Sequence, residues 1–344
     1  MAHPAPIKPV IVGCAGVSLS DAERALFAAH RPAGLILFKR NCQSPDQLRA
    51  LVADFKDAVG RHRLPVLIDQ EGGRVVRLGA PHWREPPAAR LFGMLAERDW
   101  AAGVEALALN CQLIAADLVE LGITVDCLPL LDLPADDADA VIGDRAYGAD
   151  AELVARLGRV AMDALVAGGC LPVIKHVPGH GRARVDSHLE LPRVEAPAAA
   201  LEAHDFAPFQ ALADAPLAMT AHIVYQAFDA DRCATLSPTV IGEVIRGRIG
   251  FEGLLMSDDL SMAALSGSLA DRARGCLDAG CDLALHCNGD MAEMTEVLDA
   301  TAPATDGLTH AIDACLDLVA DPQPLDRAAA LDRLDALLAP LGTV

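Results

Sequence analysis

Short apolar runs alternate with helical repeats along most of the chain. The runs at 9–12 (PVIV), 34–38 (GLILF) and 64–68 (LPVLI) have the length and composition of buried strands. Five further runs follow, at 123–131, 171–174, 217–220, 253–256 and 283–285. Between most of them, apolar residues recur at the spacing of a helix that faces a core. The pattern therefore predicts eight buried strands separated mostly by helices.

The helix predicted over residues 44–60 has the clearest boundaries. Ser44 and Gln47 have the spacing of a capping box, and Pro45 suits the first helical position. Gly60 supplies a C-terminal stop. This segment therefore predicts a complete unit of helix between two strands.

Polar residues directly follow at least six of the predicted strands. Asp69 follows the run at 64–68, and Asp258 follows the run at 253–256. The richest cluster, KHVPGHGRARVDSH at 175–188, follows the run at 171–174. Active sites of (β/α)8 barrels are assembled in this way, from the loops after the strands. We therefore expect a single (β/α)8, TIM-like barrel.

This barrel is expected to span residues 1–344 as one catalytic domain, with a helical C-terminal part over 291–344. A doubly wound parallel sheet is the alternative, because local patterns cannot show closure. Such a sheet would normally carry a GxGxxG turn after its first strand, and Gly13 to Gly16 does not supply one.

Composition and charge restrict the partners. Of the 344 residues, 52% are hydrophobic but only 3% are aromatic, so the core must consist mainly of Ala, Leu, Val and Ile. A net charge of −20 disfavours nucleic acid, whose phosphates would be repelled. The sequence has neither a secretory signal nor an apolar stretch approaching the roughly 20 residues of a membrane span. We expect a cytoplasmic protein that does not bind membranes, and a monomer.

Metal and cofactor chemistry is not expected. The ten cysteines include no CxxC pair, and no HExxH motif occurs. Most of the cysteines should be small buried residues in a reducing compartment. A metal-dependent barrel hydrolase using His176, His180, His188 and an Asp remains an alternative, because the 175–188 loop is rich in histidine.

The polar residues predicted to share one pocket suit an oxygen-rich ligand. Arg and Lys side chains each donate several hydrogen bonds, and a carboxylate such as Asp69 accepts two from neighbouring hydroxyls, which is how a sugar ring would be held. Asp258 could act as a nucleophile or as an electrostatic stabiliser. The residues expected in the pocket are Asp69, Arg77, Arg145, Lys175, His176, His188, His222 and Asp258.

Asp186 and His188 are separated by one residue. In an extended loop, this spacing puts both side chains on one side, so the carboxylate could orient the imidazole and raise its pKa. Such a histidine can donate a proton and later remove one.

Five motifs resemble family 3 of the glycoside hydrolases, and more narrowly its bacterial β-N-acetylglucosaminidases of cell-wall recycling. They are LIDQEGGRVVRL (67–78), KHVPGHG (175–181), DSH (186–188), MTAH (219–222) and MSDDLSM (256–262). The resemblance implies a retaining mechanism with Asp258 as nucleophile and with His188, paired with Asp186, as acid/base. It implies that the terminal N-acetylglucosamine is bound by Asp69, Arg77, Arg145, Lys175 and His176.

The implied substrate is a muropeptide fragment, N-acetylglucosamine linked β-1,4 to 1,6-anhydro-N-acetylmuramic acid, with or without its peptide. Val177 replaces the Phe common in the KHFPGHG motif, and Tyr147 closes a DRAY sequence where DRSF is usual. These departures concern the shape of the pocket and the rate. A β-glucosidase or a broader exo-glycosidase of the same family is the alternative enzyme, and a catalytically dead sugar-binding protein is the alternative outside enzymes.

Overall fold

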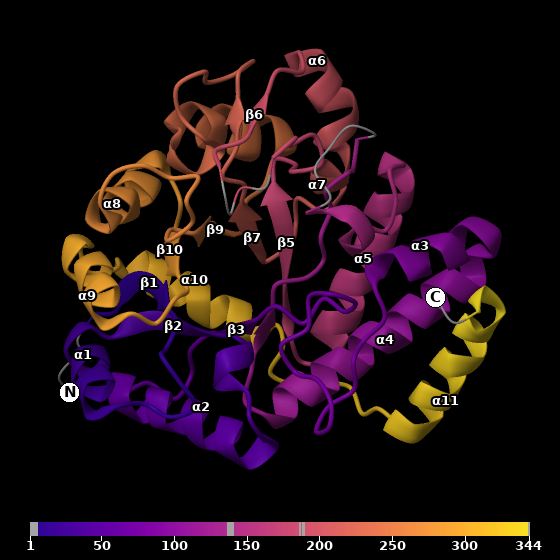
Figure 1. The fold of residues 1–344 in the computed structure, drawn as a ribbon, viewed down its shortest axis with the longest axis horizontal. Helices are drawn as coiled ribbons and strands as arrows, with labels where there is room; N and C mark the ends of the chain where they lie inside the picture. The colour runs from indigo at the N-terminus through magenta and orange to yellow at the C-terminus, as the bar shows by residue number, and fades with distance from the viewer. Residues whose placement is uncertain (1–5, 136–140, 186, 188–189, 343–344) are drawn as a thin grey trace.

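The strands form a closed parallel barrel at the centre of the molecule, and the helices surround it (Figure 1). The computed structural model describes residues 6–135, 141–185, 187 and 190–342. Each barrel strand pairs with the next one along the chain, and the last pairs with the first. In chain order they are β1 (Lys8–Val12), β2 (Pro32–Leu37), β3 (Val66–Ile68), β4 (Val125–Asp126), β5 (Leu171–Val177), β7 (Leu217–Thr220), β9 (Leu254–Asp259) and β10 (Leu283–His286).

Closure confirms the predicted (β/α)8 barrel, because a doubly wound sheet would leave two open edges. The inside of the barrel is filled by aliphatic and sulfur-containing side chains, among them Ile11, Leu67, Val173 and Met256. A second apolar layer packs between the strands and the outer helices. The low aromatic content of the sequence therefore agrees with a barrel interior that consists mainly of branched aliphatic residues.

Helices connect the strands on the outside of the barrel. The longer ones in the first half are α1 (Asp21–His30), α2 (Pro45–Val59), α3 (Ala89–Arg98), α4 (Trp100–Glu120) and α5 (Ala151–Ala167). The second half contains the short helices α6 (Ala198–Ala200) and α7 (Ala207–Ala211) and the longer helices α8 (Leu269–Ala279), α9 (Met291–Ala300), α10 (Asp306–Asp317) and α11 (Arg327–Leu338). Segments of 3-10 or π geometry are η1 (Lys39–Asn41), η2 (Gly143–Arg145), η3 (Leu201–Asp205), η4 (Ala234–Leu236), η5 (Val240–Ile249) and η6 (Ala339–Leu341).

Helix α2 has the predicted ends. The Ser44 hydroxyl accepts a hydrogen bond from the backbone N–H of Gln47, and the Gln47 side chain accepts one from the backbone N–H of Ser44. Gly60 takes the left-handed conformation, with φ 69°, at the C-terminal end.

Three strand boundaries differ from the sequence prediction. Strand β4 is only two residues long, because the backbone N–H of Leu128 turns back to the Asp126 carbonyl and the next residue, Pro129, has no N–H to donate to a neighbouring strand. Strands β5 and β9 run further than predicted and include Lys175, His176 and Asp258, which were expected in the loops beyond them. Two short segments, β6 (Arg193–Val194) and β8 (Val224–Tyr225), form a separate parallel pair that was not predicted.

Helix α4 corrects the expectation that no segment is long and apolar enough for a membrane span. Within the described residues, it passes that test by length and composition. Half of its most apolar stretch is buried inside the protein, and the helix packs against α3, α5 and α11. These are the contacts of a core helix.

Candidate active site

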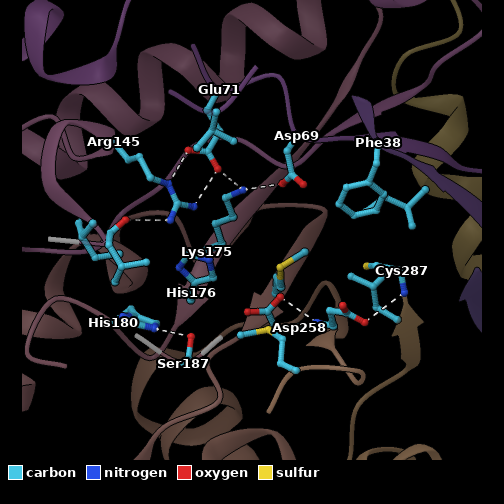
Figure 2. A pocket seen from close by; sticks show the side chains of 18 of the residues that line it. Phe38, Asp69, Glu71, Arg145, Lys175, His176, His180, Ser187, Asp258 and Cys287 are labelled. Atoms are coloured by element: carbon cyan, nitrogen blue, oxygen red, sulfur yellow. Dashed lines mark hydrogen bonds and ion pairs between the residues drawn. The ribbon is translucent and has the colours of Figure 1, made fainter. Parts of the chain in front are cut away.

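A cavity of about 340 Å³ opens at the carboxyl ends of the barrel strands (Figure 2). Its lining brings together six of the predicted site residues from four different strands or the loops after them. These six are Asp69, Arg77, Arg145, Lys175, His176 and Asp258. His222 is fully buried and is not among the lining residues.

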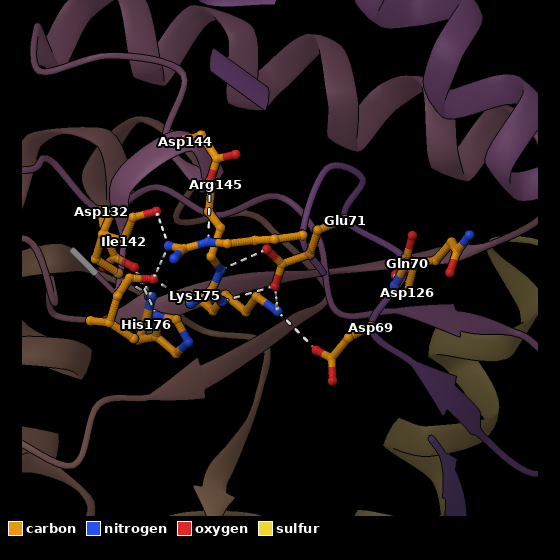
Figure 3. Close-up of polar contacts among 12 residues, drawn as sticks. Asp69, Gln70, Glu71, Asp126, Asp132, Ile142, Asp144, Arg145, Lys175 and His176 are labelled. Atoms are coloured by element: carbon orange, nitrogen blue, oxygen red, sulfur yellow. Dashed lines mark hydrogen bonds and ion pairs between the residues drawn. The ribbon is translucent and has the colours of Figure 1, made fainter. Parts of the chain in front are cut away.

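Lys175 is the centre of an ion-pair network on one wall of the cavity (Figure 3). Its ammonium lies 2.9 Å from Asp69 Oδ1 and 2.5 Å from Glu71 Oε1, although the residue is only 1% exposed. Glu71 in turn accepts two hydrogen bonds from the Arg145 guanidinium, at 2.8 and 2.9 Å. Arg77 donates to Asp69 Oδ2 at 3.1 Å. Each buried charge on this wall therefore has a partner of opposite sign.

These contacts keep the network charged. Burial alone would raise the pKa of Asp69, but Lys175 and Arg77 outweigh burial and hold it well below its usual range. Burial would likewise raise the pKa of Glu71, and Lys175 with Arg145 instead lowers it to about 2. Burial would lower the pKa of Lys175, but the two carboxylates raise it. The wall therefore presents fixed donors and acceptors at neutral pH.

Glu71 was not selected from the sequence, although its carboxylate joins Lys175 to Arg145. It lies in the DQEGGR segment, two residues after Asp69, and 74 residues separate it from Arg145. Its position just after Asp69, at the end of a predicted strand, indicates a second carboxylate that could accept a hydrogen bond from Lys175.

Gln70 holds the loop that carries Arg77. Its side-chain oxygen accepts hydrogen bonds from the backbone N–H groups of Arg77 and Leu78, each at 3.0 Å. Its side-chain nitrogen donates to the Leu78 carbonyl at 2.9 Å, and its own N–H donates to Asp126. The 70–78 loop is thereby closed on itself, which positions the Arg77 side chain against Asp69.

Asp132 positions the segment around His176. This fully buried carboxylate accepts a hydrogen bond from His176 Nδ1 at 2.7 Å and from the backbone N–H of His180 at 2.6 Å. The proton on Nδ1 leaves Nε2 as the other polar atom of the His176 ring. Asp132 was also not selected from the sequence, because its partners lie 44 and 48 residues away.

Asp258 lies at the carboxyl end of β9, on the opposite side of the cavity from Arg145 (Figure 2). Its Oδ1 accepts a hydrogen bond from the backbone N–H of Asp259 at 2.8 Å. The Asp259 carboxylate accepts from the backbone N–H groups of Cys287 and Ser261, each at 3.1 Å. Asp259 lines the cavity as well, but its carboxylate is occupied by the backbone of the turn after the strand.

Two predicted catalytic residues, Asp186 and His188, lie outside the described residues. Ser187, between them, is described and lines the cavity. Its hydroxyl lies 3.1 Å from His180 Nε2. Burial, with a smaller contribution from His176, lowers the pKa of His180 to about 4, so this ring is neutral at pH 7. His180 thus contacts the segment that carries the DSH motif.

The cavity lining also includes apolar side chains. Among them are Ile36, Phe38, Met219, Met262, Leu285 and Cys287, and Figure 2 shows Phe38 and Cys287 on the side away from Arg145. Phe38 is the aromatic residue among the lining residues, and the guanidinium of Arg77 lies 5.2 Å from its ring centre. A ligand in this cavity meets charged groups on one side and an apolar surface on the other, as a sugar with hydroxyl edges and C–H faces would require.

Metal binding finds no geometric support in the described part of the chain. Residues 6–135, 141–185, 187 and 190–342 contain no group of three or more His, Cys, Asp or Glu side chains placed to hold an ion. In the described cavity wall, Asp69 and Glu71 are instead neutralised by Lys175 and the arginines.

Comparison with known proteins identifies relatives over most of the chain. Residues 10–315 match the Glycosyl hydrolase family 3 N terminal domain. A β-hexosaminidase of Alkalilimnicola ehrlichii is 44% identical over 287 residues, which are 81% of this chain and 80% of that protein. The crystal structure of native NagZ from Neisseria gonorrhoeae superposes with a TM-score of 0.84 and 32% identity, covering 98% of this chain and 99% of that one.

A second structure of the Neisseria gonorrhoeae protein, in complex with N-trifluoroacetyl-D-glucosamine, gives a TM-score of 0.85 at 32% identity. It covers 97% of this chain and 98% of that chain. The similarity thus includes both the barrel and the segments that build the cavity.

Proposed function

Because this chain belongs to family 3 of the glycoside hydrolases and is a β-hexosaminidase, we propose that it is a retaining exo-β-N-acetylglucosaminidase. Its substrate is a muropeptide in which terminal N-acetylglucosamine is linked β-1,4 to 1,6-anhydro-N-acetylmuramic acid, with or without peptide. It acts on this substrate in cell-wall recycling, in the cytoplasm, as a monomer without a cofactor.

Asp258 is the nucleophile. Its carboxylate attacks the anomeric carbon, and the bond from that carbon to the aglycone oxygen breaks as the glycosyl-enzyme ester forms. His188, oriented by Asp186, donates a proton to the departing oxygen. The same histidine then takes a proton from water, which attacks the anomeric carbon and releases Asp258 and N-acetylglucosamine.

The observation that carries the proposal is the position of Asp258 across the cavity from the Lys175 network. Asp69 accepts hydrogen bonds from sugar hydroxyls, and Lys175, Arg77 and Arg145 donate to sugar oxygens. His176, with its Nδ1 proton held by Asp132, presents Nε2 to a further hydroxyl. A ring fixed by these groups would place its anomeric carbon toward Asp258.

The test is hydrolysis of p-nitrophenyl N-acetyl-β-D-glucosaminide and of the natural-type disaccharide, with EDTA present. Asp258→Ala should lose at least about 10³-fold in kcat on both substrates, because no ester can form. His188→Ala should lose about 10²- to 10⁴-fold on the disaccharide but far less on the nitrophenyl glycoside, whose leaving group needs little protonation. Asp57→Ala, on the exposed face of α2, is the control and should match wild type.

Two further measurements bear on mechanism and substrate class. Proton NMR of the first product should show the β-anomer, and an initial α-anomer would contradict retention. Wild type should be much slower on p-nitrophenyl β-D-glucoside than on the 2-acetamido substrate. Equal rates would favour a broad exo-glycosidase, and inactivity on both would refute the proposal.

A further inference from the structure

His222 lies behind the cavity wall and bridges two strand ends. It follows β7 by two residues and is fully buried. Its Nε2 lies 2.9 Å from the backbone carbonyl oxygen of Asp259, at the end of β9. Its Nδ1 lies 2.7 Å from the hydroxyl of Thr235, which in turn lies 2.8 Å from the hydroxyl of Thr220. Both threonines are also fully buried.

The acceptors around the ring determine its tautomer. A carbonyl oxygen can only accept, so Nε2 must carry a proton and donate to Asp259. Burial lowers the pKa of His222, so the ring is neutral and Nδ1 has no proton. Nδ1 therefore accepts from the Thr235 hydroxyl, and Thr235 accepts from Thr220. The Ala221 carbonyl, at 3.2 Å, is a second and more distant acceptor for the Thr235 hydroxyl. The three side chains form a directed series of hydrogen bonds that ends on Asp259.

Asp259 transmits this constraint to Asp258. Its backbone N–H donates to Asp258 Oδ1 at 2.8 Å, and its carboxylate is held by Ser261 and by the backbone N–H of Cys287. The carbonyl oxygen of Asp259 accepts from His222 Nε2 at 2.9 Å and from the backbone N–H of Met262 at 3.2 Å, and His222 is the side chain that holds it from the neighbouring strand end. A shift of Asp259 would turn the N–H that orients the Asp258 carboxylate.

We propose that Thr220, Thr235 and His222 form a positioning chain that aims the Asp258 carboxylate at the anomeric carbon. The inference rests on the proposed role of Asp258 as nucleophile. None of the three is a catalytic residue, because each acts through Asp259. Small displacements of a reacting group lower the rate more than they lower ground-state binding.

The experiment compares Thr235→Val with Thr235→Ser. Valine keeps the volume but removes the hydroxyl, so Nδ1 loses its donor and the ring is held by its Nε2 hydrogen bond to Asp259 without the support of Thr235. We expect kcat on p-nitrophenyl N-acetyl-β-D-glucosaminide to fall about 10- to 100-fold, while the inhibition constant of N-acetylglucosamine changes less than about twofold. Serine restores the hydroxyl and should recover most of kcat.

Thr301→Val is the matched control. Thr301 is also a buried threonine, 3% exposed, but it bonds to the Leu298 carbonyl at the end of α9 and does not line the cavity. It should keep the wild-type kcat. Thermal unfolding of every variant separates loss of positioning from loss of folded protein.

The proposal is overturned if Thr235→Val keeps the kcat of wild type and of Thr235→Ser. It is also overturned if Thr235→Val weakens N-acetylglucosamine inhibition in proportion to kcat, because that result describes a loosened pocket. Asp258→Ala, measured in parallel, distinguishes a failure of the positioning chain from a failure of the nucleophile assignment. An inactive Asp258→Ala with an unaffected Thr235→Val refutes only the positioning chain, whereas an active Asp258→Ala refutes the nucleophile assignment beneath it.

Discussion

At the scale of single residues, the carboxyl group of Asp126 is buried with only one of its two oxygens hydrogen-bonded. Its Oδ1 accepts from the backbone N–H of Gln70 at 2.9 Å, but its buried Oδ2 has no hydrogen-bond partner among the described residues. Burial raises the pKa of Asp126 to about 7, because too few contacts stabilise the charged form. Folding therefore favours the protonated form of this side chain.

We predict that Asp126→Asn removes a loss of stability that wild type undergoes as pH rises. A carboxyl whose pKa is raised by folding favours the folded state below its ordinary pKa of 3.8, and this contribution is lost as pH rises through about 7. The asparagine cannot ionise. Between pH 5 and 8, wild type should lose on the order of 2 to 4 kcal/mol relative to Asp126→Asn, measured by urea unfolding. Parallel pH profiles for the two proteins would contradict this.

Several charged residues that line the cavity were predicted from the sequence, but Glu71 and the residues that hold the loops in place were not. Asp69, Lys175 and Asp258 could be found because each follows a recognisable apolar run. Asp132 and Gln70 could not, because their importance lies in hydrogen bonds to backbone groups of a folded loop. Such contacts leave no periodic signal.

At the scale of elements, the packing of helix α3 against the segment after η2 depends on Gly93. A Cβ at Gly93 would lie 1.7 Å from the carbonyl oxygen of Tyr147, next to the η2 segment that carries Arg145. At Gly242, in the helical segment η5, a Cβ would meet nothing within 4 Å. Both glycines lie in helical segments, but of the two only Gly242 has room for a Cβ.

Gly93→Ala and Gly242→Ala should therefore change stability in opposite directions. Alanine favours a helix by up to about 1 kcal/mol over glycine, so Gly242→Ala should be stabilising. At Gly93 the overlap should outweigh that gain, lower stability by about 1 to 3 kcal/mol and raise KM through displacement of Arg145. Thermal unfolding and steady-state kinetics measure both. A stabilised Gly93→Ala with normal KM would show that α3 can move without disturbing the site.

Element boundaries were predictable where the signal is local. The ends of α2 follow from Ser44, Gln47 and Gly60 alone. The extension of β5 through Lys175 was not predictable, because a charged residue stays in a buried strand only when distant carboxylates neutralise it. Helix α3 was missed because a proline-rich connection precedes it and its apolar stripe is short.

At the scale of the whole molecule, eight buried strands with helices between them were enough to predict the barrel, since each unit repeats the same local pattern. The net charge of −20 adds a long-range property that no single contact reveals. The field of such a protein repels anions, and salt screens it over about 10 Å at 0.1 M.

We predict that kcat/KM for an anionic muropeptide rises by about two- to tenfold when salt increases from 20 to 200 mM, because screening weakens this repulsion. The neutral p-nitrophenyl glycoside serves as the control and should change little. Stopped assays at several salt concentrations give the salt dependence of kcat/KM for the muropeptide and for the glycoside. If kcat/KM for the muropeptide falls as salt increases, the positive charges of Lys175, Arg145 and Arg77 dominate the field that an anion meets.

The packing of α11 against α4 has a consequence for how the chain is synthesised. In Figure 1 the yellow α11 lies along α4, and Arg327 pairs with Glu120, 207 residues earlier. A ribosome adding about 5 to 20 residues per second needs roughly 10 to 40 seconds to make the intervening chain. During that interval an apolar helix of membrane-spanning length is without one of its covering partners. Chaperone binding to nascent chains should therefore peak after α4 emerges and decline only when α11 is released.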